Sequence, residues 1–201
     1  MSGERIFPDW QELYRTTPSE SLPWYHEPLD ADLEQALERW QVASGRALDL
    51  GAGPGTQAIA LAGRGFDVTG SDLSQAAVEK AAALAAERGA SVRFVQDDIL
   101  DSRLAERFDV VFDRGCFHCL PPERRGDYAR TLGRLVAPGG LFFLKCFSVL
   151  EPRDGGPYRF TPGDIREVFG EYFEVLSVHE TVYQGSLDPL PRALFVVLKP
   201  R

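Results

Sequence analysis

A run of glycines preceded by an acidic residue forms a pattern that can bind a small ligand near residue 50. The apolar run 47–50 leads into Gly51-Ala52-Gly53-Pro54-Gly55-Thr56, and a helical pattern follows. In an α/β protein such a loop lies where a ligand meets the carboxyl edge of the sheet. A tight turn from a strand into a helix is the alternative interpretation, because a glycine triplet alone is not specific.

The spacing and charge of this loop indicate which ligand it takes. Its Gly-x-Gly-x-Gly spacing differs from the dinucleotide pattern Gly-x-Gly-x-x-Gly, and Pro54 removes a backbone N–H that a pyrophosphate would use. Asp49 would repel a diphosphate, whereas it could attract the ammonium of a methionine-like ligand, directly or through water. The predicted ligand is therefore S-adenosylmethionine, and the predicted contacts here are Asp49, Gly51, Gly53 and Gly55.

Acidic residues also follow the next two predicted strands. Asp72 ends the second strand, 17 residues after Gly55, where its carboxylate could accept hydrogen bonds from both hydroxyls of a ribose. Capping the helix that starts near Ser74 is the alternative role. Asp97-Asp98-Ile99 ends the third strand and could offer a carboxylate to an adenine amino group and an apolar side chain to the ring, or form a solvated turn. The predicted cofactor contacts at these strand ends are Asp72, Leu73, Asp98 and Ile99.

The fourth strand leads into a segment rich in reactive side chains. It ends in Asp113-Arg114-Gly115, so Asp113 and Arg114 would face the cofactor and the acceptor, or form an internal ion pair. Cys116-Phe117-His118-Cys119 follows. A Cys-x-x-Cys pair can form a disulfide or half a zinc site, but the second half of such a site is missing, so we expect buried thiols and no metal. His118 is a candidate active-site wall or proton acceptor, with a core or surface histidine as the alternative.

Four large aromatic residues lie among prolines in residues 1–28: Trp10, Tyr14, Trp24 and Tyr25. The prolines predict a short helix and an ordered loop rather than a long element. The rings could attach this segment to the rest of the domain. Alternatively, they form a lid that covers the sulfonium and excludes water, because aromatic ring faces attract cations.

Alternating apolar runs and helical patterns must position these residues. Helical spacing covers 30–42, with Gly45 expected to end that helix. Short apolar runs then predict strands at 47–50, 66–70, 92–95, 110–112 and 141–146, separated by helices near 56–64, 74–88 and 122–136. This alternation predicts a parallel sheet with crossover helices.

The C-terminal pattern is different. A helix at about 161–169 precedes strands at 173–183 and 193–198, and the few residues between these strands permit only an antiparallel pair. The predicted fold is therefore α/β, a doubly wound, Rossmann-like, seven-stranded, mostly parallel sheet with a C-terminal antiparallel hairpin. This pattern resembles the class I S-adenosylmethionine-dependent methyltransferases.

Composition limits the remaining choices. The 201 residues are 44% hydrophobic and 26% charged, which excludes a disordered chain, a collagen-like repeat and a membrane protein. We expect one domain over 1–201, with an N-terminal helical and aromatic lid over 1–44 and a catalytic core over 45–201. The net charge of -8 and the scattered basic residues argue against nucleic acid as a partner. Three cysteines and the lack of a signal-peptide pattern predict a cytoplasmic protein. We also expect a monomer or a weak homodimer.

Several segments are similar to the thiopurine, thiol and halide methyltransferase group within that fold. They are Asp9-Trp10-Gln11 with Tyr14, the 49–55 loop, Asp113-Arg114-Gly115, Tyr128-Ala129, Gly156-Pro157-Tyr158, and Asp164-Ile165 with Phe169-Gly170. The resemblance implies that Trp10, Asp72, Ile99 and Arg114 contact the cofactor. It also implies that Trp24 or Tyr25, His118 and Tyr158 line the acceptor pocket. The thiopurine enzymes usually have a longer N-terminal arm, a Cys-Gly-Lys type loop and Glu at the second strand end, so thiopurine specificity is not implied.

These observations predict methyl transfer to a small soft nucleophile, most plausibly a thiol or a related sulfur, selenium or halide acceptor. Positioning and desolvation of the acceptor would supply most of the acceleration. A neutral thiol would have to lose its proton to Asp113, His118 or a water held by Arg114, whereas an ionised acceptor needs no base. The alternatives are an O- or N-methyltransferase of a small metabolite and a non-catalytic nucleotide-binding subunit.

Overall fold

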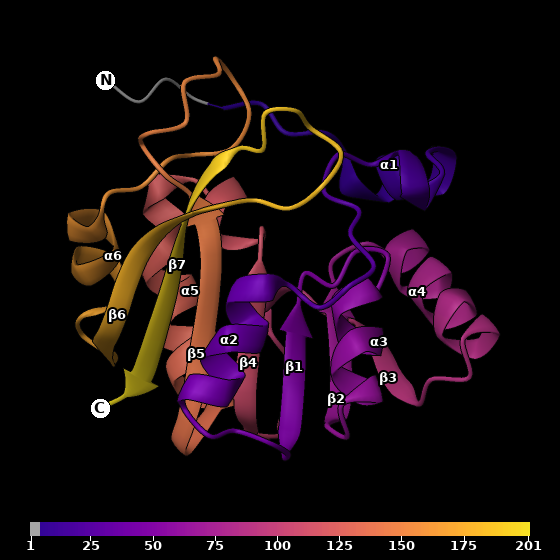
Figure 1. The fold of residues 1–201 in the computed structure, drawn as a ribbon, viewed down its shortest axis with the longest axis horizontal. Coiled ribbons are helices and arrows are strands. Elements are labelled where there is room, and N and C mark those ends of the chain that lie inside the picture. Colours follow the sequence, from indigo (N-terminus) through magenta and orange to yellow (C-terminus); the bar gives the residue numbers. More distant parts are fainter. Residues whose placement is uncertain (1–4) are drawn as a thin grey trace.

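Seven strands form one sheet in the computed structural model, which describes residues 5–201. They are β1 (Arg46–Leu50), β2 (Asp67–Asp72), β3 (Val92–Gln96), β4 (Phe108–Arg114), β5 (Val136–Phe147), β6 (Phe173–Val182) and β7 (Arg192–Pro200). Their order is β3-β2-β1-β4-β5-β7-β6, with β1 to β5 parallel and β7 antiparallel to both of its neighbours (Figure 1). The predicted fold class is confirmed.

Helices cover both faces of this sheet (Figure 1). They are α1 (Trp10–Thr16), α2 (Ala31–Arg39), α3 (Thr56–Gly63), α4 (Gln75–Glu87), α5 (Arg125–Leu135) and α6 (Pro162–Phe169). Short 3-10 turns lie at Ser19–Ser21, Ile99–Asp101, Phe117–Cys119 and Pro122–Arg124. Apolar side chains of α2 and α3 join the core on one face, and those of α5 and α6 join it on the other.

Strand β5 shows why the central strands are apolar throughout. Phe142 and Leu144 pack with Phe169 of α6, while Phe143 between them packs on the opposite face with Leu37 of α2. Successive side chains of a strand point to opposite faces, and both faces are covered here, so every position from Gly140 to Cys146 is buried. The polar residues therefore collect where the strands end.

Helix α2 ends earlier than predicted. It stops at Arg39, and Gln41 takes the left-handed conformation with a φ of 55°. The turn is closed by hydrogen bonds from Gln41 N to Glu38 O (3.1 Å) and from Val42 N to Leu37 O (2.9 Å). The prediction that Gly45 ends the helix was wrong, because the backbone hydrogen bonds of the last turn tolerate a non-glycine residue in this conformation.

The N-terminal segment is divided between the core and the predicted lid. Leu29, Leu33 and Leu37 belong to the core beside the sheet, whereas Tyr14 and Leu22 form a separate apolar cluster with α4. Only the part before Leu29 can therefore cover a site, and residues 1–4 of the predicted lid lie outside the described residues. Helix α1 is held on α4 by Gln11, whose side-chain oxygen accepts hydrogen bonds from Ser74 Oγ and Ala76 N.

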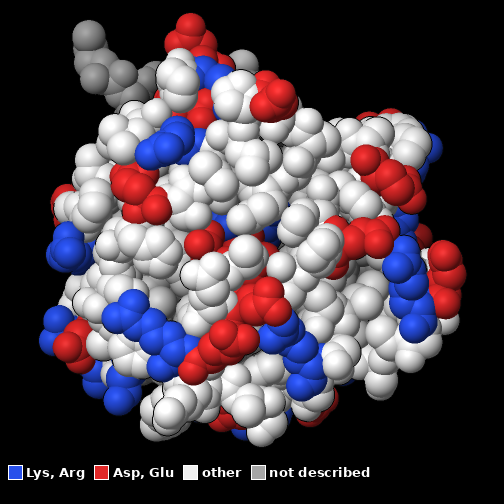
Figure 2. All heavy atoms as spheres, viewed as in Figure 1, with Lys and Arg blue, Asp and Glu red and all other residues white. Residues whose placement is uncertain are grey.

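The charged surface is mixed in sign. Figure 2 shows Lys and Arg side chains interspersed with Asp and Glu over one face of the molecule. Within residues 5–201, no helix has both the length and the apolar character that crossing a membrane requires.

Candidate active site

A cavity of about 590 Å³ opens at the carboxyl ends of the parallel strands. Its walls come from these strand ends, the N-terminal segment, the loop that follows β5 and the β6–β7 loop. Predicted site residues that line it are Trp10, Trp24, Asp49, Gly51, Gly53, Asp72, Leu73, Asp98, Ile99, Arg114 and His118. The cavity therefore brings together most of the residues that the sequence singled out.

The glycine loop turns tightly beneath the N-terminal helix. Gly53 has a φ of 51°, and a Cβ at this position would lie 2.6 Å from the Tyr14 hydroxyl oxygen. Its N–H donates to Asp72 Oδ2 at 2.9 Å. Glycine is required here because both the backbone conformation and the approach of Tyr14 exclude a side chain.

Gly55 has a different role. It is left-handed with a φ of 79° at the start of α3, and a Cβ there would lie 2.7 Å from Ala81 Cβ and 2.8 Å from Phe94 Cζ. It does not line the cavity. The predicted contact of Gly55 with the cofactor was wrong, since this glycine allows α4 and β3 to pack against the loop from below.

Two buried carboxylates flank the loop. Asp49 is 2% exposed and accepts a hydrogen bond from Ala58 N at 2.9 Å, and its burial raises the pKa of its carboxyl to about 7. Asp72 accepts from Gly53 N and from Ser74 N, both at 2.9 Å, and burial raises its pKa as well. Asp72 thus supports the turn before Ser74, whose own side chain caps α4, and it also borders the cavity. Its contact with the ribose stays a prediction.

The end of β3 supplies a third acidic wall. Asp98 is exposed, and its Oδ1 accepts a hydrogen bond from Leu100 N at 2.9 Å. The neighbouring Ile99 is 6% exposed, and Leu73 lies across the opening at 54% exposure. The carboxylates of Asp97 and Asp98 and the apolar side chains of Leu73, Ile99 and Leu100 therefore line the cavity at this end.

These carboxylates and apolar walls fit S-adenosylmethionine. Carboxylates at the ends of β1, β2 and β3 complement an ammonium, ribose hydroxyls and an adenine amino group, while Pro54 leaves the loop with fewer N–H donors for a phosphate. When bound, this cofactor supplies a methyl group on a sulfonium whose leaving group is a neutral thioether. Trp10 and Trp24 line the same cavity with ring centroids 6.1 Å apart, and such ring faces attract a cation.

Asp113 lies outside the cavity. It is fully buried, and its two oxygens accept hydrogen bonds from the N–H groups of Gly115, Cys116 and Phe117 and from the Tyr128 hydroxyl. Burial raises the pKa of its carboxyl. The predicted contacts of Asp113 with cofactor and acceptor were wrong, because this carboxylate folds the turn after β4 back onto the strand end.

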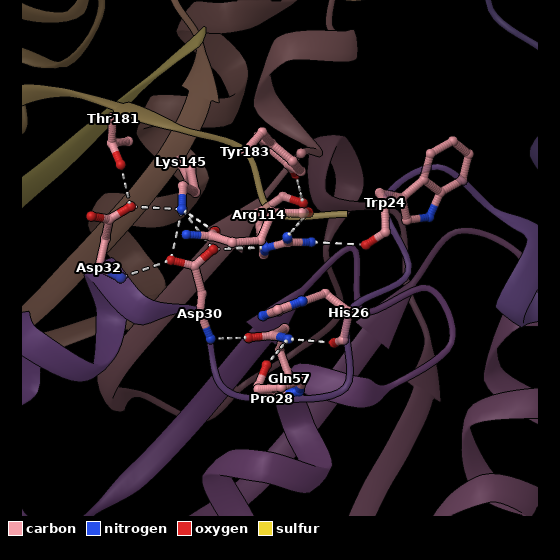
Figure 3. Close-up of polar contacts among 12 residues, drawn as sticks. Trp24, His26, Pro28, Asp30, Asp32, Gln57, Arg114, Lys145, Thr181 and Tyr183 are labelled. Atoms are coloured by element: carbon pink, nitrogen blue, oxygen red, sulfur yellow. Dashed lines mark hydrogen bonds and ion pairs between the residues drawn. The ribbon is translucent and has the colours of Figure 1, made fainter. Parts of the chain in front are cut away.

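Arg114 borders the cavity, but its guanidinium is bound by the protein itself (Figure 3). Nε donates to Asp30 Oδ2 at 2.9 Å, Nη1 to Trp24 O at 3.0 Å, and Nη2 to the main-chain oxygen of Gln184. The guanidinium also lies 4.5 Å from the centre of the Tyr183 ring. Arg114 thus forms a buried ion pair with Asp30 rather than with Asp113, and it still borders the cavity.

His118 is a neutral wall of the cavity. Its Nδ1 accepts a hydrogen bond from Phe147 N at 3.3 Å, so the neutral ring carries its proton on Nε2. Burial and the nearby charge of Arg114 lower the pKa of His118 to about 3. In this arrangement the lone pair of the ring is already in use, which disfavours His118 as the predicted proton acceptor.

Two predicted acceptor contacts lie elsewhere. Tyr25 is not part of the cavity lining, and its hydroxyl donates to Glu27 Oε1 at 2.8 Å. Tyr158 is 7% exposed, and the Arg125 guanidinium packs 4.8 Å from the centre of the Tyr158 ring. The backbone N–H of Tyr158 donates to His118 O. Neither side chain lines the cavity, so the predicted contacts of Tyr25 and Tyr158 with the acceptor were wrong.

The structure adds walls that the sequence did not predict. They are Phe147 at the end of β5, Arg153 and Arg159 in the following loop, and Tyr183 and Leu187 in the β6–β7 loop. None of them belongs to a recognisable motif, and only the return of distant loops over the sheet edge brings them together. Tyr14, which the sequence assigned to the N-terminal aromatic group, also reaches the cavity.

Cys146 is buried, whereas Cys116 and Cys119 are half-buried and line the cavity. Cys119 Sγ donates to Gly115 O at 3.4 Å, and burial raises the pKa of both Cys116 and Cys119. All three cysteines are free. Within residues 5–201, no group of three or more His, Cys, Asp or Glu side chains could hold a metal ion.

Comparison with known proteins decides the family. A methyltransferase-domain family matches residues 47–140. The chain is 30% identical over 174 residues to 2-heptyl-1-hydroxyquinolin-4(1H)-one methyltransferase of Mycobacteroides abscessus, covering 83% of this chain and 76% of that protein. The chain belongs to the class I S-adenosylmethionine-dependent methyltransferases. It is an enzyme with S-adenosylmethionine as its cofactor.

Two other similarities concern sulfur chemistry. This methyltransferase is 30% identical over 142 residues to thiocyanate methyltransferase 1 of Brassica oleracea, covering 69% of this chain and 63% of that protein. A solved structure from echinomycin biosynthesis, where a disulfide bond is converted into a thioacetal group, superposes with a TM-score of 0.82 at 27% identity. That superposition covers 95% of this chain and 91% of the other. The predicted resemblance to the thiol methyltransferase group is confirmed.

Proposed function

We propose that this enzyme methylates a small, soft nucleophile that reaches the cavity already ionised, namely the thiolate of a small thiol. The observation that carries the proposal is the state of the three residues predicted to remove a proton, namely Asp113 and His118 directly and Arg114 through a water. Asp113 is saturated and outside the cavity, the lone pair of His118 accepts the Phe147 N–H, and all three nitrogens of Arg114 donate within the protein. An acceptor that needs no base suits such a site.

The protein's contribution is then to hold and desolvate the acceptor. The walls beyond the cofactor-binding half include Phe147, Tyr183 and Leu187, which exclude water, and the neutral His118. A dry pocket strengthens the reactivity of an anion because its hydration shell is lost on entry. Holding the acceptor sulfur in line with the methyl group supplies the remaining acceleration. The similarity to thiocyanate and thiol methyltransferases supports a sulfur acceptor.

A panel of acceptors tests the proposal. The enzyme is incubated with S-adenosylmethionine and thiols, selenols, halides, phenols or amines, and S-adenosylhomocysteine is quantified against acceptor-free controls. We expect turnover with soft nucleophiles. For thiols of different acidity, kcat/KM should rise with pH and level off at the pKa of each thiol. A plateau at one fixed pH for every thiol would instead reveal a general base on the enzyme and contradict the proposal.

A second candidate is O-methylation of an acidic N-hydroxy heteroaromatic compound. The relative from Mycobacteroides abscessus, with 83% of this chain aligned, acts by its name on 2-heptyl-1-hydroxyquinolin-4(1H)-one. An acidic N–OH group would also arrive ionised, so the same cavity chemistry applies. Including such a compound in the panel separates the two candidates by the identity of the methylated atom.

A further inference from the structure

Four charged side chains form a buried cluster beside the cavity (Figure 3). Lys145 Nζ lies 2.7 Å from Asp30 Oδ2 and 2.6 Å from Asp32 Oδ2, and Arg114 Nε lies 2.9 Å from Asp30 Oδ2. The side chains of Asp30 and Lys145 have 0% exposure. The start of α2 is thus joined to the ends of β4 and β5 by two cations and two carboxylates.

Stability alone is a poor reason for this cluster. Removing ions from water costs free energy that an ion pair in the interior often only offsets, and apolar side chains of similar size would pack at least as well. Although burial raises the pKa of Asp30, Lys145 and Arg114 together hold it below its usual value, so the cluster stays charged. The cluster therefore serves to orient the groups that its charged side chains bind.

The cluster holds two segments that cover the cavity. Arg114 donates to Trp24 O at 3.0 Å and to Gln184 O, and Lys145 Nζ donates to Gln184 Oε1 at 2.6 Å. Asp30 N donates to Gln57 Oε1 at 2.8 Å. The two covering segments also bond each other, from Ser186 N to Pro23 O at 3.1 Å.

The residues at the centre of the cluster do not touch the cavity, whereas the residues they hold do. Trp24, Tyr183 and Arg114 line it, and Asp30 and Lys145 do not. We propose that Lys145 is a positioning residue for the acceptor end of the cavity. It holds the Gln184 segment directly and, through Asp30 and Arg114, the Trp24 segment. The inference rests on the proposed function, because the acceptor end is defined by it.

Two variants separate positioning from simple charge balance. Lys145→Met removes the cation and leaves one excess buried carboxylate, while Lys145→Met combined with Asp32→Asn restores neutrality and keeps the Asp30–Arg114 pair. Lys199→Met removes an exposed lysine on β7 and serves as the control. Acceptor KM and kcat, the dissociation constant of S-adenosylhomocysteine and the free energy of unfolding are measured for each.

The double variant decides the outcome. We expect it to recover most of the stability lost in Lys145→Met and to bind S-adenosylhomocysteine with a dissociation constant within about twofold of that of the original protein. Its kcat/KM for the acceptor should stay roughly 10- to 100-fold below that of the original protein, because KM is raised. If it regains the original acceptor KM, Lys145 only balances charge and the proposal is overturned. The Lys199→Met control should match the original protein in all four measurements.

A readout without turnover keeps this test independent of the acceptor. Hydrogen–deuterium exchange at 23–28 and 184–188 is followed in the double variant, with the β4 amides as internal reference. Faster exchange confined to the two covering segments supports positioning by Lys145, even if every acceptor in the panel fails. Unchanged exchange in these segments overturns the positioning role of Lys145. The proposed methyl transfer is tested separately by the acceptor panel.

Discussion

At the scale of single residues, acidic side chains at strand ends line the part of the cavity where we expect the cofactor. Asp49 and Asp72 were predicted from their position after apolar runs, and both border the cavity. Their burial has opposite consequences for stability and for binding. A carboxylate in a poorly hydrated place destabilises the ligand-free protein, yet it is strongly attracted to a cation or hydroxyl that enters.

The first prediction concerns Asp72. Asp72→Ala should weaken S-adenosylhomocysteine binding roughly 100-fold, because the hydrogen bonds from the two ribose hydroxyls to the charged carboxylate are lost. Asp67→Ala, at the exposed opposite end of the same strand, is the matched control and should bind normally. Calorimetric titration checks both variants. Equal affinities for the two would remove Asp72 from the cofactor site.

The second prediction uses the pKa of Asp49, which burial raises to about 7. Because the folded-state pKa lies above the unfolded value, the contribution of Asp49 to stability is fully present below pH 4 and is lost as the pH rises through about 7. Asp49→Asn should therefore be more stable than the original protein at pH 8 without ligand, with a smaller difference at pH 5. It should also bind S-adenosylhomocysteine more weakly. Thermal unfolding at the two pH values, followed by titration, checks this, and a pH-independent difference would contradict it.

At the scale of elements, the turn after β4 is organised by a carboxylate rather than used for catalysis. Asp113 holds three successive N–H groups and Tyr128 of α5, so it fixes where Arg114 and His118 lie. The segments that resemble the thiol methyltransferases therefore include residues that build the site as well as residues that border it. Tyr128 and Gln11 are of the first kind.

The third prediction tests that role. Asp113→Asn should destabilise the protein by about 2–3 kcal/mol, because an amide nitrogen would face donors that now find an oxygen. Asp101→Asn, at an exposed position, should change stability by less than about 0.5 kcal/mol. Chemical denaturation measures both. Unchanged stability with turnover abolished would restore Asp113 as a catalytic residue.

At the scale of the whole molecule, the cavity is enclosed by segments that are far apart in the chain. The Lys145–Asp30 contact joins residues 115 positions apart, and the Arg114–Gln184 contact joins residues 70 apart. Binding at such a site should stabilise the entire fold, since the ligand contacts strand ends, the N-terminal segment and both late loops. The single domain, the cytoplasmic location and the monomeric or weakly dimeric state stay predictions.

The fourth prediction is a ligand-induced shift in unfolding temperature. At a concentration about 100 times its dissociation constant, S-adenosylhomocysteine should add roughly 2.7 kcal/mol of stability, or about 5–10 °C in Tm. Asp72→Ala should lose this shift at the same concentration. A dinucleotide that raised Tm more than S-adenosylhomocysteine did would contradict the cofactor assignment at the described site.

The sequence by itself determined the order of strands and helices along the chain, the fold class and the sheet edge at which the cavity opens. Apolar periodicity and glycine spacing are local signals, and the carboxyl ends of parallel strands meet at one edge whatever the loops do. Asp49, Asp72 and Ile99 could therefore be placed correctly before any coordinates were known.

Only the tertiary structure decided where individual side chains point. Asp113, Tyr25, Tyr158 and Gly55 turned out to lie outside the cavity, while Tyr183 and Phe147 entered it. A side chain chooses its direction from the hydrogen-bond partners and apolar surfaces that distant segments bring to it, and no local pattern encodes these. Lys145 is an example, since it sits in an apolar strand and acquires its charged partners only when α2 and the β6–β7 loop pack around it.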